Sequence, residues 1–461
     1  MKRRRVIRGV LAMGYGKAVV ALIQLAMVPA LATAWGLPLY GQWLLLATVP
    51  VFLAAGDFGF GSAAGNRLIG EVARDDIEAA KITFHSALAV VVGCSSTIFV
   101  LVIAICELLP DEALTVSGGM DGGSARSVLI VLSAYGVISM QSSLFMAAMR
   151  AHGAFALSTS FEATVQLTEG LVVIAIVMAG GTPLHAAFGY VSVRSVGVAG
   201  HITLAIRRAD WLGLSFRQLQ RSRVSELLRP SLAAMLLPFA QAAYLQGTAL
   251  AVGLAAGAAA VPIFTSLRTL SRVGLQFLLA FNMPILPEFT AEYARNNFSW
   301  TKKIVGAFTT LNAAVGSIAA LILLLMGNSL LDWWTRGAID APQAMIGLTA
   351  AGLLASAVWN PMSYFLLAVN RHEGFTYVFG AAACAAVMLS YALVRHFGVT
   401  GAAFANLLLE IFMLVCVFLQ LRTLTGPIAL SPTAVWRLLI PRDRLRASGT
   451  RGARRSADRR A

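Results

Sequence analysis

The sequence predicts an all-α integral membrane protein with about 12 transmembrane helices and with both termini in the cytoplasm. Composition, the length of the apolar runs and the placement of positive charge lead to this fold class. Of the 461 residues, 58% are hydrophobic and only 12% are charged, whereas a soluble domain has about 25% charged residues. The apolar runs are about 20 residues long, the length at which a helix crosses the hydrocarbon core. An ordinary soluble enzyme is therefore excluded.

Twelve apolar segments follow one another along the chain, and each is expected to be one membrane span. Trp35, Tyr40 and Trp43 flank the first predicted outer turn, as interfacial aromatic residues do. An alternative for the first segment is a cleaved signal peptide, but Lys17 interrupts its apolar stretch. The twelve segments cover residues 9–34, 42–64, 82–106, 127–149, 158–178, 185–206, 231–254, 261–286, 304–331, 343–368, 376–394 and 400–421.

Positive charge is distributed unequally between the two sides of this arrangement. With the amino terminus inside, the connections and tails expected in the cytoplasm carry 29 Lys and Arg residues, and the outer connections carry three: Arg126, Arg336 and Arg395. This is the positive-inside pattern, and it requires an even number of spans. Anionic lipid at the inner surface is the expected partner of the basic termini.

The longest internal connection divides the spans into two sets of six. It covers residues 207–230, carries six arginines and is expected to be a cytoplasmic loop between two lobes. A short internal repeat supports this division, because GTPLHAAF at 181–188 opens the sixth span and GVTGAAF at 398–404 opens the twelfth. The predicted organisation is an N-terminal lobe at 1–206, the loop, a C-terminal lobe at 231–424 and a basic cytoplasmic tail at 425–461.

Eight ionisable side chains lie within the predicted spans, where a charge costs about 2.5 to 3.5 kcal/mol on insertion scales and commonly marks a pathway. A helical rise of about 1.5 Å per residue places Lys17 and Asp57 at one depth near the cytoplasm, and Glu169 and Arg194 at mid-membrane. Each pair is either a structural ion pair or part of a hydrated cavity. The eight residues are Lys17, Asp57, Glu162, Glu169, Arg194, Arg268, Arg272 and Glu410.

Arg268 and Arg272 are the most informative of these charges. They are four residues apart, so they share one helix face, and Glu410 is the one intramembrane acid predicted in the same half. Two guanidinium groups on one face suit a phosphate or diphosphate, which arginine binds through bidentate hydrogen bonds. The alternative is that they pair with Glu162 or Glu169 across the lobes.

The acids suggest ion coupling. Glu162, Gln166 and Glu169 follow one another at i, i+4 and i+7 and form a polar stripe along the fifth span. A desolvated carboxylate has a raised pKa and exchanges a proton more readily near neutral pH. Proton or sodium coupling through these acids, with Asp57 and Glu410 as further cavity acids, is one hypothesis. Neutralisation of nearby arginines is the other.

Several classes of function are disfavoured. The chain has no GxxxxGK[ST] motif and no CxxC or zinc-type spacing among its four cysteines, so neither a cofactor nor a metal site is expected. Its positive charge flanks membrane spans instead of forming one nucleic-acid-binding face. The outer loops are too short for an enzyme's active site. Transport or channel activity remains.

The residues also resemble a known family. Six plus six spans, the run YGQW at 40–43 that leads to GDFGFG at 56–61, and the turn at 398–403 are similar to polysaccharide exporters of the O-antigen flippase type, in the multidrug/oligosaccharidyl-lipid/polysaccharide exporter superfamily. This resemblance implies two six-helix lobes around a central cavity that opens alternately to each side. It places Lys17, Asp57, Arg268 and Arg272 on the cavity wall, and it implies cationic substrate contacts at Lys17, Arg268, Arg272 and Arg194.

The resemblance further implies a substrate and a location. The substrate would be an undecaprenyl-diphosphate-linked oligosaccharide, such as an O-antigen, capsule or exopolysaccharide repeat unit, moved from the inner to the outer leaflet of the bacterial cytoplasmic membrane. Partners would include polysaccharide polymerase or export machinery. The alternatives are an ion-coupled multidrug antiporter of the same superfamily and a murein-precursor flippase. A non-transporting scaffold and a glycan polymerase or ligase are further rivals.

Overall fold

The computed structural model describes residues 2–55, 59–209, 211–212, 218–282, 298–368 and 373–425, and the regular structure of these residues is helical. The helices are α1 (Lys2–Leu46), α2 (Thr48–Ala55), α3 (Phe60–Ala73), α4 (Ile77–Leu108), α5 (Asp111–Leu114), α6 (Gly122–Ala151), α7 (Phe155–Met178), α8 (Pro183–Arg208), α9 (Arg221–Ala256), α10 (Ala260–Asn282), α12 (Phe298–Thr335), α13 (Gln343–Ala368), α14 (Glu373–Phe397) and α15 (Val399–Thr425).

The helices support a multi-pass membrane protein. Within the described part of the chain, nine helical stretches are long and apolar enough to cross a membrane. Each of the twelve predicted segments overlaps at least one helix. The complete set of twelve spans and the side on which the termini lie stay predictions.

The first predicted outer turn is a kink inside α1. Gly36 has φ 72°, a conformation that glycine adopts without a steric penalty, and helix continues on both sides of it. The second predicted span is divided over the end of α1, then α2 and α3. Asp57 falls between α2 and α3, at 56–58, which lie outside the described residues.

The chain forms two compact units. The first unit contains Met1–Thr269, Asn328–Met345 and Ala383–Ala405; the second contains Leu270–Gly327, Ile346–Ala382 and Asn406–Ala461. These boundaries are drawn by contacts between helices and do not follow the loop at 207–230. The expected division into lobes at that loop stays a prediction.

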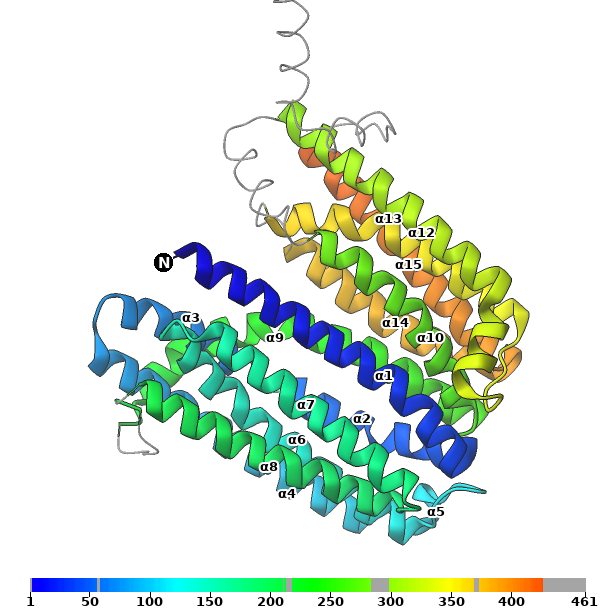
Figure 1. The fold of residues 1–461 in the computed structure, drawn as a ribbon, viewed down its shortest axis with the longest axis horizontal. Coiled ribbons are helices and arrows are strands. Elements are labelled where there is room, and N and C mark those ends of the chain that lie inside the picture. Colours follow the sequence, from blue (N-terminus) through cyan, green and yellow to red (C-terminus); the bar gives the residue numbers. More distant parts are fainter. Residues whose placement is uncertain are drawn as a thin grey trace, which may run out of the picture. The chain divides into compact units, whose positions relative to one another are not determined.

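In the first unit, α7 packs against both α1 and α8, and α6 packs against α8, α3, α4 and α2 (Figure 1). Two apolar clusters form its core. One surrounds Phe60, Phe84 and Phe145 on α3, α4 and α6. The other contains Leu31 and Trp43 of α1, together with residues of α6, α7 and α8. Between membrane helices, close van der Waals packing of such side chains favours association.

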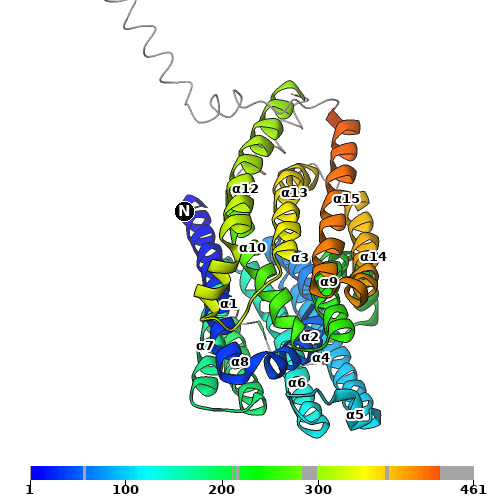
Figure 2. The same cartoon turned by 90° about the vertical axis from the view of Figure 1, so that its right-hand side faces the viewer.

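In the second unit, α13 packs against α12 and α15 (Figure 2). Small residues allow this packing, as is common between membrane helices. Gly316 of α12 faces Ala357 of α13, and Gly352 of α13 faces Leu407 and Glu410 of α15. The approach at Gly352 brings α13 and α15 close enough for polar side chains on the two helices to bond.

Candidate functional site

A close contact between α7 and α8 creates the main polar cluster of the first unit. Gly197 and Gly200 of α8 lie against Val165 and Phe161 of α7, and a β-carbon at either glycine would overlap those side chains. The missing side chains therefore bring the two backbones together. One turn from Gly197, Arg194 faces the acidic stripe of α7.

Arg194 forms ion pairs with two carboxylates. Its Nη1 donates to Glu162 Oε1 at 2.8 Å, and its Nη2 donates to Glu169 Oε2 at 2.7 Å. Its Nε lies 2.6 Å from Glu169 Oε1, so the guanidinium and this carboxylate meet at two points. Tyr135 of α6 donates to Glu169 Oε2 at 3.2 Å. Arg194 and Glu169 are each only 3% exposed, so the expected pairing of Glu169 with Arg194 is present and is buried.

Two more side chains complete the cluster around Glu162. Gln166 Nε2 donates to Glu162 Oε1 at 3.0 Å, and His201 Nε2 lies 3.0 Å from Glu162 Oε2. The His201 side chain is fully buried, and its edge meets the ring of Phe161. The cluster thus holds two carboxylates, one guanidinium and one imidazole. Such a set can exchange a proton, and it also locks α6, α7 and α8 together.

Arg268 is held by the neighbouring helix. Its Nη1 donates to the carbonyl of Leu245 at 2.8 Å and to Thr248 Oγ1 at 2.9 Å, both on α9. Its guanidinium carbon lies 5.0 Å from the ring centre of Phe264, a cation–π distance. The side chain is half-buried. Its guanidinium is therefore oriented by fixed groups, as a bidentate anion contact requires.

The second unit contains the other acid. Trp359 Nε1 of α13 donates to Glu410 Oε2 at 2.7 Å, and Ser356, one turn before Trp359, also bonds to this carboxylate. Arg272 acts on Glu410 electrostatically and is itself exposed. The two charges predicted at mid-membrane in the C-terminal half are thus electrically linked.

The remaining predicted residues are Lys17 and Asp57. Lys17 is exposed on α1, the helix that packs along α7. Asp57 lies outside the described residues, so the expected pairing of Lys17 with Asp57 stays a prediction. Among the described residues, no group of three or more His, Cys, Asp or Glu side chains is placed to hold a metal ion.

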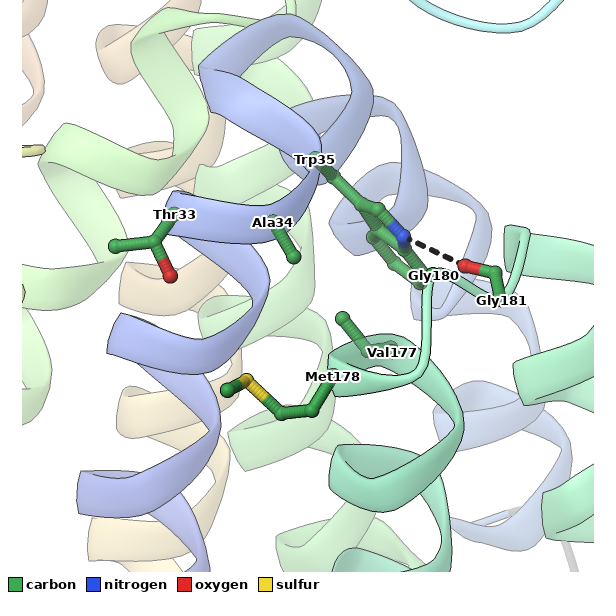
Figure 3. A pocket seen from close by; sticks show the side chains of 7 residues that line it. All are labelled: Thr33, Ala34, Trp35, Val177, Met178, Gly180 and Gly181. Atoms are coloured by element: carbon green, nitrogen blue, oxygen red, sulfur yellow. Dashed lines mark hydrogen bonds between the residues drawn. The ribbon is translucent and has the colours of Figure 1, made fainter.

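A small cavity of about 310 Å³ lies at one end of α1 and α7, away from these charges (Figure 3). The side chain of Trp35 lines this cavity, and its Nε1 donates to the carbonyl of Gly181 at 3.0 Å. Its lining is mostly apolar and contains none of the predicted binding residues: Thr33, Ala34, Trp35, Val177, Met178, Gly180 and Gly181. It is therefore not the candidate site for a charged substrate.

Four participants were not identified as site residues from the sequence: Tyr135, His201, Thr248 and Trp359. His201 lies seven residues after Arg194 on the same face of α8, and this spacing does signal the cluster. Tyr135, Thr248 and Trp359 reach their partners from other helices, 20 to 59 residues away along the chain. No local pattern marks them.

Comparison with solved structures identifies the fold. A multidrug resistance MATE family transporter of the MOP superfamily, in an inward-facing conformation, matches with a TM-score of 0.67 at 17% identity, over 88% of this chain and 98% of that one. The lipid II flippase MurJ, in an inward closed conformation, matches with a TM-score of 0.68 at 12% identity, over 90% of this chain and 87% of that one.

A third structure, a MOP superfamily transporter from Pyrococcus furiosus described as having a binding pocket of reverse polarity, matches with a TM-score of 0.62 at 16% identity, over 92% of this chain and 95% of that one. No protein-family model matches the chain, and no curated protein matches it. At these identities the likeness concerns the fold: the chain has the fold of MOP superfamily transporters and flippases.

Proposed function

We propose that this protein is a flippase that moves an undecaprenyl-diphosphate-linked oligosaccharide from the inner to the outer leaflet of a bacterial cytoplasmic membrane. One observation carries the proposal: α10 presents two guanidinium groups four residues apart, Arg268 oriented by α9 and Arg272 exposed. Arginine binds phosphate oxygens in a planar, bidentate geometry. A diphosphate linked to a lipid is an anion that would reach such residues from within the membrane.

The charge distribution of the first unit supports an anionic substrate. Glu162 and Glu169 are bonded to Arg194, with His201 and Tyr135 completing their contacts. These carboxylates are therefore compensated, whereas a cationic drug needs an acidic side chain that can turn to the ligand. The family resemblance implied a substrate contact for Arg194, but this side chain bonds to Glu162 and Glu169. We assign it to the support of the cluster and leave the diphosphate to Arg268, Arg272 and Lys17.

The mechanism is alternating access. The diphosphate is drawn to the arginines of α10 while the polyprenyl tail stays in lipid. The protein then changes conformation, exposes the sugar to the outside, and releases it because the outward state binds it more weakly. A ligand shifts such an equilibrium only by its difference in affinity for the two states. Net direction requires removal of the product outside or an ion gradient that acts through Asp57, Glu162, Glu169 or Glu410.

The decisive experiment measures binding and transport in the whole protein. Purified protein in liposomes is titrated with undecaprenyl diphosphate, and R268A/R272A is compared with R268K/R272K. The alanine pair should lose binding by about 100-fold or more, since two charge-assisted contacts are removed, each worth about 1.5 to 3 kcal/mol. The lysine pair should fall in between because it keeps the charge and loses the planar fork.

Arg395 is the matched control. It also lies over an aromatic ring, that of Tyr391, at 5.8 Å, and R395A should leave binding unchanged. Deletion of the gene should abolish one surface glycan and leave its lipid-linked unit inside the cell. Wild-type binding by R268A/R272A, with normal protein levels in the membrane, would overturn the diphosphate assignment.

Two other candidates rest on the structural neighbours. An ion-coupled multidrug antiporter is favoured by the MATE likeness and by Glu410, a carboxylate beside the indole of Trp359. Sensitivity to cationic drugs after gene deletion, with an unchanged glycan, would select it. A murein-precursor flippase is favoured by the MurJ likeness, and accumulation of lipid II inside the cell would select that one.

The proposal also covers location and partners. We place the protein in the bacterial inner membrane as a multi-pass protein, with anionic lipid at its basic termini and polysaccharide polymerase or export machinery as its neighbours. The termini fit this because Lys2, Arg3, Arg4 and Arg5 precede the first apolar segment and anionic lipid attracts each such residue by about 1 kcal/mol.

A further inference from the structure

The segment Asn328–Met345, here called the α12–α13 hairpin, belongs to a different compact unit from the chain on either side of it. It contains the end of α12 and the first residues of α13 and groups with α1, whereas Leu270–Gly327 and Ile346–Ala382 belong to the second unit. Its covalent connections therefore lead to one unit, while its own contacts are with the other.

The hairpin is seated in an apolar core. Ile339 is only 2% exposed and belongs to the cluster that contains Leu31 and Trp43 of α1, and Trp334 and Ala338 pack against the same cluster. Trp333, the adjacent residue, is 80% exposed. The hairpin therefore presents one apolar side to the first unit and the other to its surroundings.

A proline in α1 makes possible a hydrogen bond between the hairpin and α1. Pro29 has no N–H, so the carbonyl four residues earlier, that of Leu25, has no donor from the regular helical ladder. Trp334 Nε1 donates to this carbonyl at 2.7 Å, across 309 residues of sequence. The indole thus satisfies an acceptor that exists because residue 29 is proline.

The turn of the hairpin is organised by its own bonds. Gly337 N donates to the Asp332 carbonyl at 2.9 Å, and Ile339 N donates to Thr335 Oγ1 at 3.1 Å. The segment can therefore keep its shape when it leaves the seat. Its contacts with α1 through Trp334 and Ile339 are those that undocking would break.

We propose that the α12–α13 hairpin is a latch: it is held on α1 by the bond from Trp334 to the carbonyl freed by Pro29, and it unseats during the conformational cycle. The proposal rests on the proposed transport function for the meaning of that cycle. It assigns distinct roles to residues that the substrate does not touch. Trp334 donates the hydrogen bond that holds the hairpin on α1, and Ile339 packs in the apolar core. Pro29 leaves the carbonyl of Leu25 available as the acceptor.

The test is the rate at which a cysteine at position 338 reacts with a membrane-impermeant maleimide. The full-length protein is placed in nanodiscs, with its four native cysteines replaced by alanine and A338C as the reporter. D340C, at an exposed position, is the reference for full access. The reporter should react measurably but more slowly than the reference, because it is protected only while the hairpin is seated.

The variant W334F removes the N–H and keeps an aromatic ring. It should raise the reaction rate at position 338 by about 3- to 10-fold, the equilibrium change expected for one lost hydrogen bond. W333F is the matched control and should have no effect. In a P29A background, the new backbone N–H at position 29 takes over the Leu25 carbonyl, so P29A should itself raise the rate and W334F should then add little.

Equal rates for W334F and W333F would overturn the latch, as would a reporter that never reacts in any variant. Equal effects of W334F with and without P29A would overturn the coupling between Pro29 and Trp334. These outcomes are separate from the diphosphate titration. If W334F raises the reaction rate but the protein does not bind undecaprenyl diphosphate, the latch is supported and the substrate assignment is wrong. If the protein binds undecaprenyl diphosphate but W334F has no effect on the rate, the substrate assignment is supported and the latch is wrong.

Discussion

Arg194 of α8 and the two arginines of α10 differ in burial. On α7 and α8, every nitrogen of the Arg194 guanidinium lies within 2.8 Å of a carboxylate oxygen, and the group is almost fully buried. On α10, Arg268 bonds to a carbonyl and a hydroxyl, and Arg272 is exposed. A buried guanidinium bonded to carboxylates stabilises the fold, whereas a guanidinium that is half-buried or exposed can be reached by a ligand.

The largest effect should come from removing Arg194. In R194A, Glu162 and Glu169 remain buried without their counter-ion, which should lower the free energy of unfolding by about 3 to 5 kcal/mol. The measurement is thermal unfolding in detergent or nanodiscs. R395A is the control, since Arg395 is exposed and exposed side chains usually change stability by less than about 0.5 kcal/mol. Equal melting temperatures for the two variants would contradict the contrast between the two regions.

The next effect tests the acid of the second unit. W359F removes the N–H that bonds to Glu410 Oε2, and it should destabilise the protein by about 1 to 3 kcal/mol because a buried acceptor loses its donor. W333F, at an exposed indole, is again the control for the loss of an N–H. If W359F melts like the wild type, Glu410 is not held by this bond.

The close approach of α7 and α8 is tested by G197A. A β-carbon there would lie 2.6 Å from Val165 Cγ1, so the helices must separate, at a cost of about 1 to 3 kcal/mol. G14A is the control, because nothing lies within 4 Å of a β-carbon at Gly14. A stable G197A variant would mean that the cluster tolerates a wider spacing than its hydrogen bonds suggest.

The smallest effect concerns how Arg268 is oriented. T248V removes the hydroxyl that accepts from Nη1 and should weaken binding of undecaprenyl diphosphate by about 3- to 10-fold, the value of one hydrogen bond, while T248S should restore it. T265V is the control, since the Thr265 hydroxyl bonds to carbonyls of its own helix. Unchanged binding by T248V, with loss of binding by R268A/R272A, would show that Arg268 does not need α9.

The helical, multi-pass membrane character of the chain was predictable because its signals are local. Apolar runs of membrane length and the inequality of positive charge are read directly from the chain, and helices lie at each predicted segment. The kink at Gly36 in place of a turn was not predictable, since a glycine in a short connection is equally compatible with a helix that continues and one that ends. The turn at Ala47 between α1 and α2 likewise divides a run that is typical of a single span.

For the site, the depth of a residue along its helix could be predicted by counting residues. Which side chain it bonds to on another helix could not be predicted. Counting residues placed Glu169 and Arg194 at one depth, and they do pair. It did not reveal that Glu162 binds the same guanidinium, or that Tyr135 and His201 complete the cluster, because these contacts depend on how closely Gly197 and Gly200 let α8 approach α7.

The hydrogen bond between Trp334 and Leu25 is a further contact that the sequence could not predict, and it joins residues that are far apart in the chain. Pro29 in the sequence already implies one backbone carbonyl without its helical donor, so the need for a partner is a local property. The identity of that partner, 309 residues away, is a property of the tertiary structure, because packing alone brings such distant segments within hydrogen-bonding distance. Chain chemistry sets which groups require partners, and helix packing selects the partners they receive.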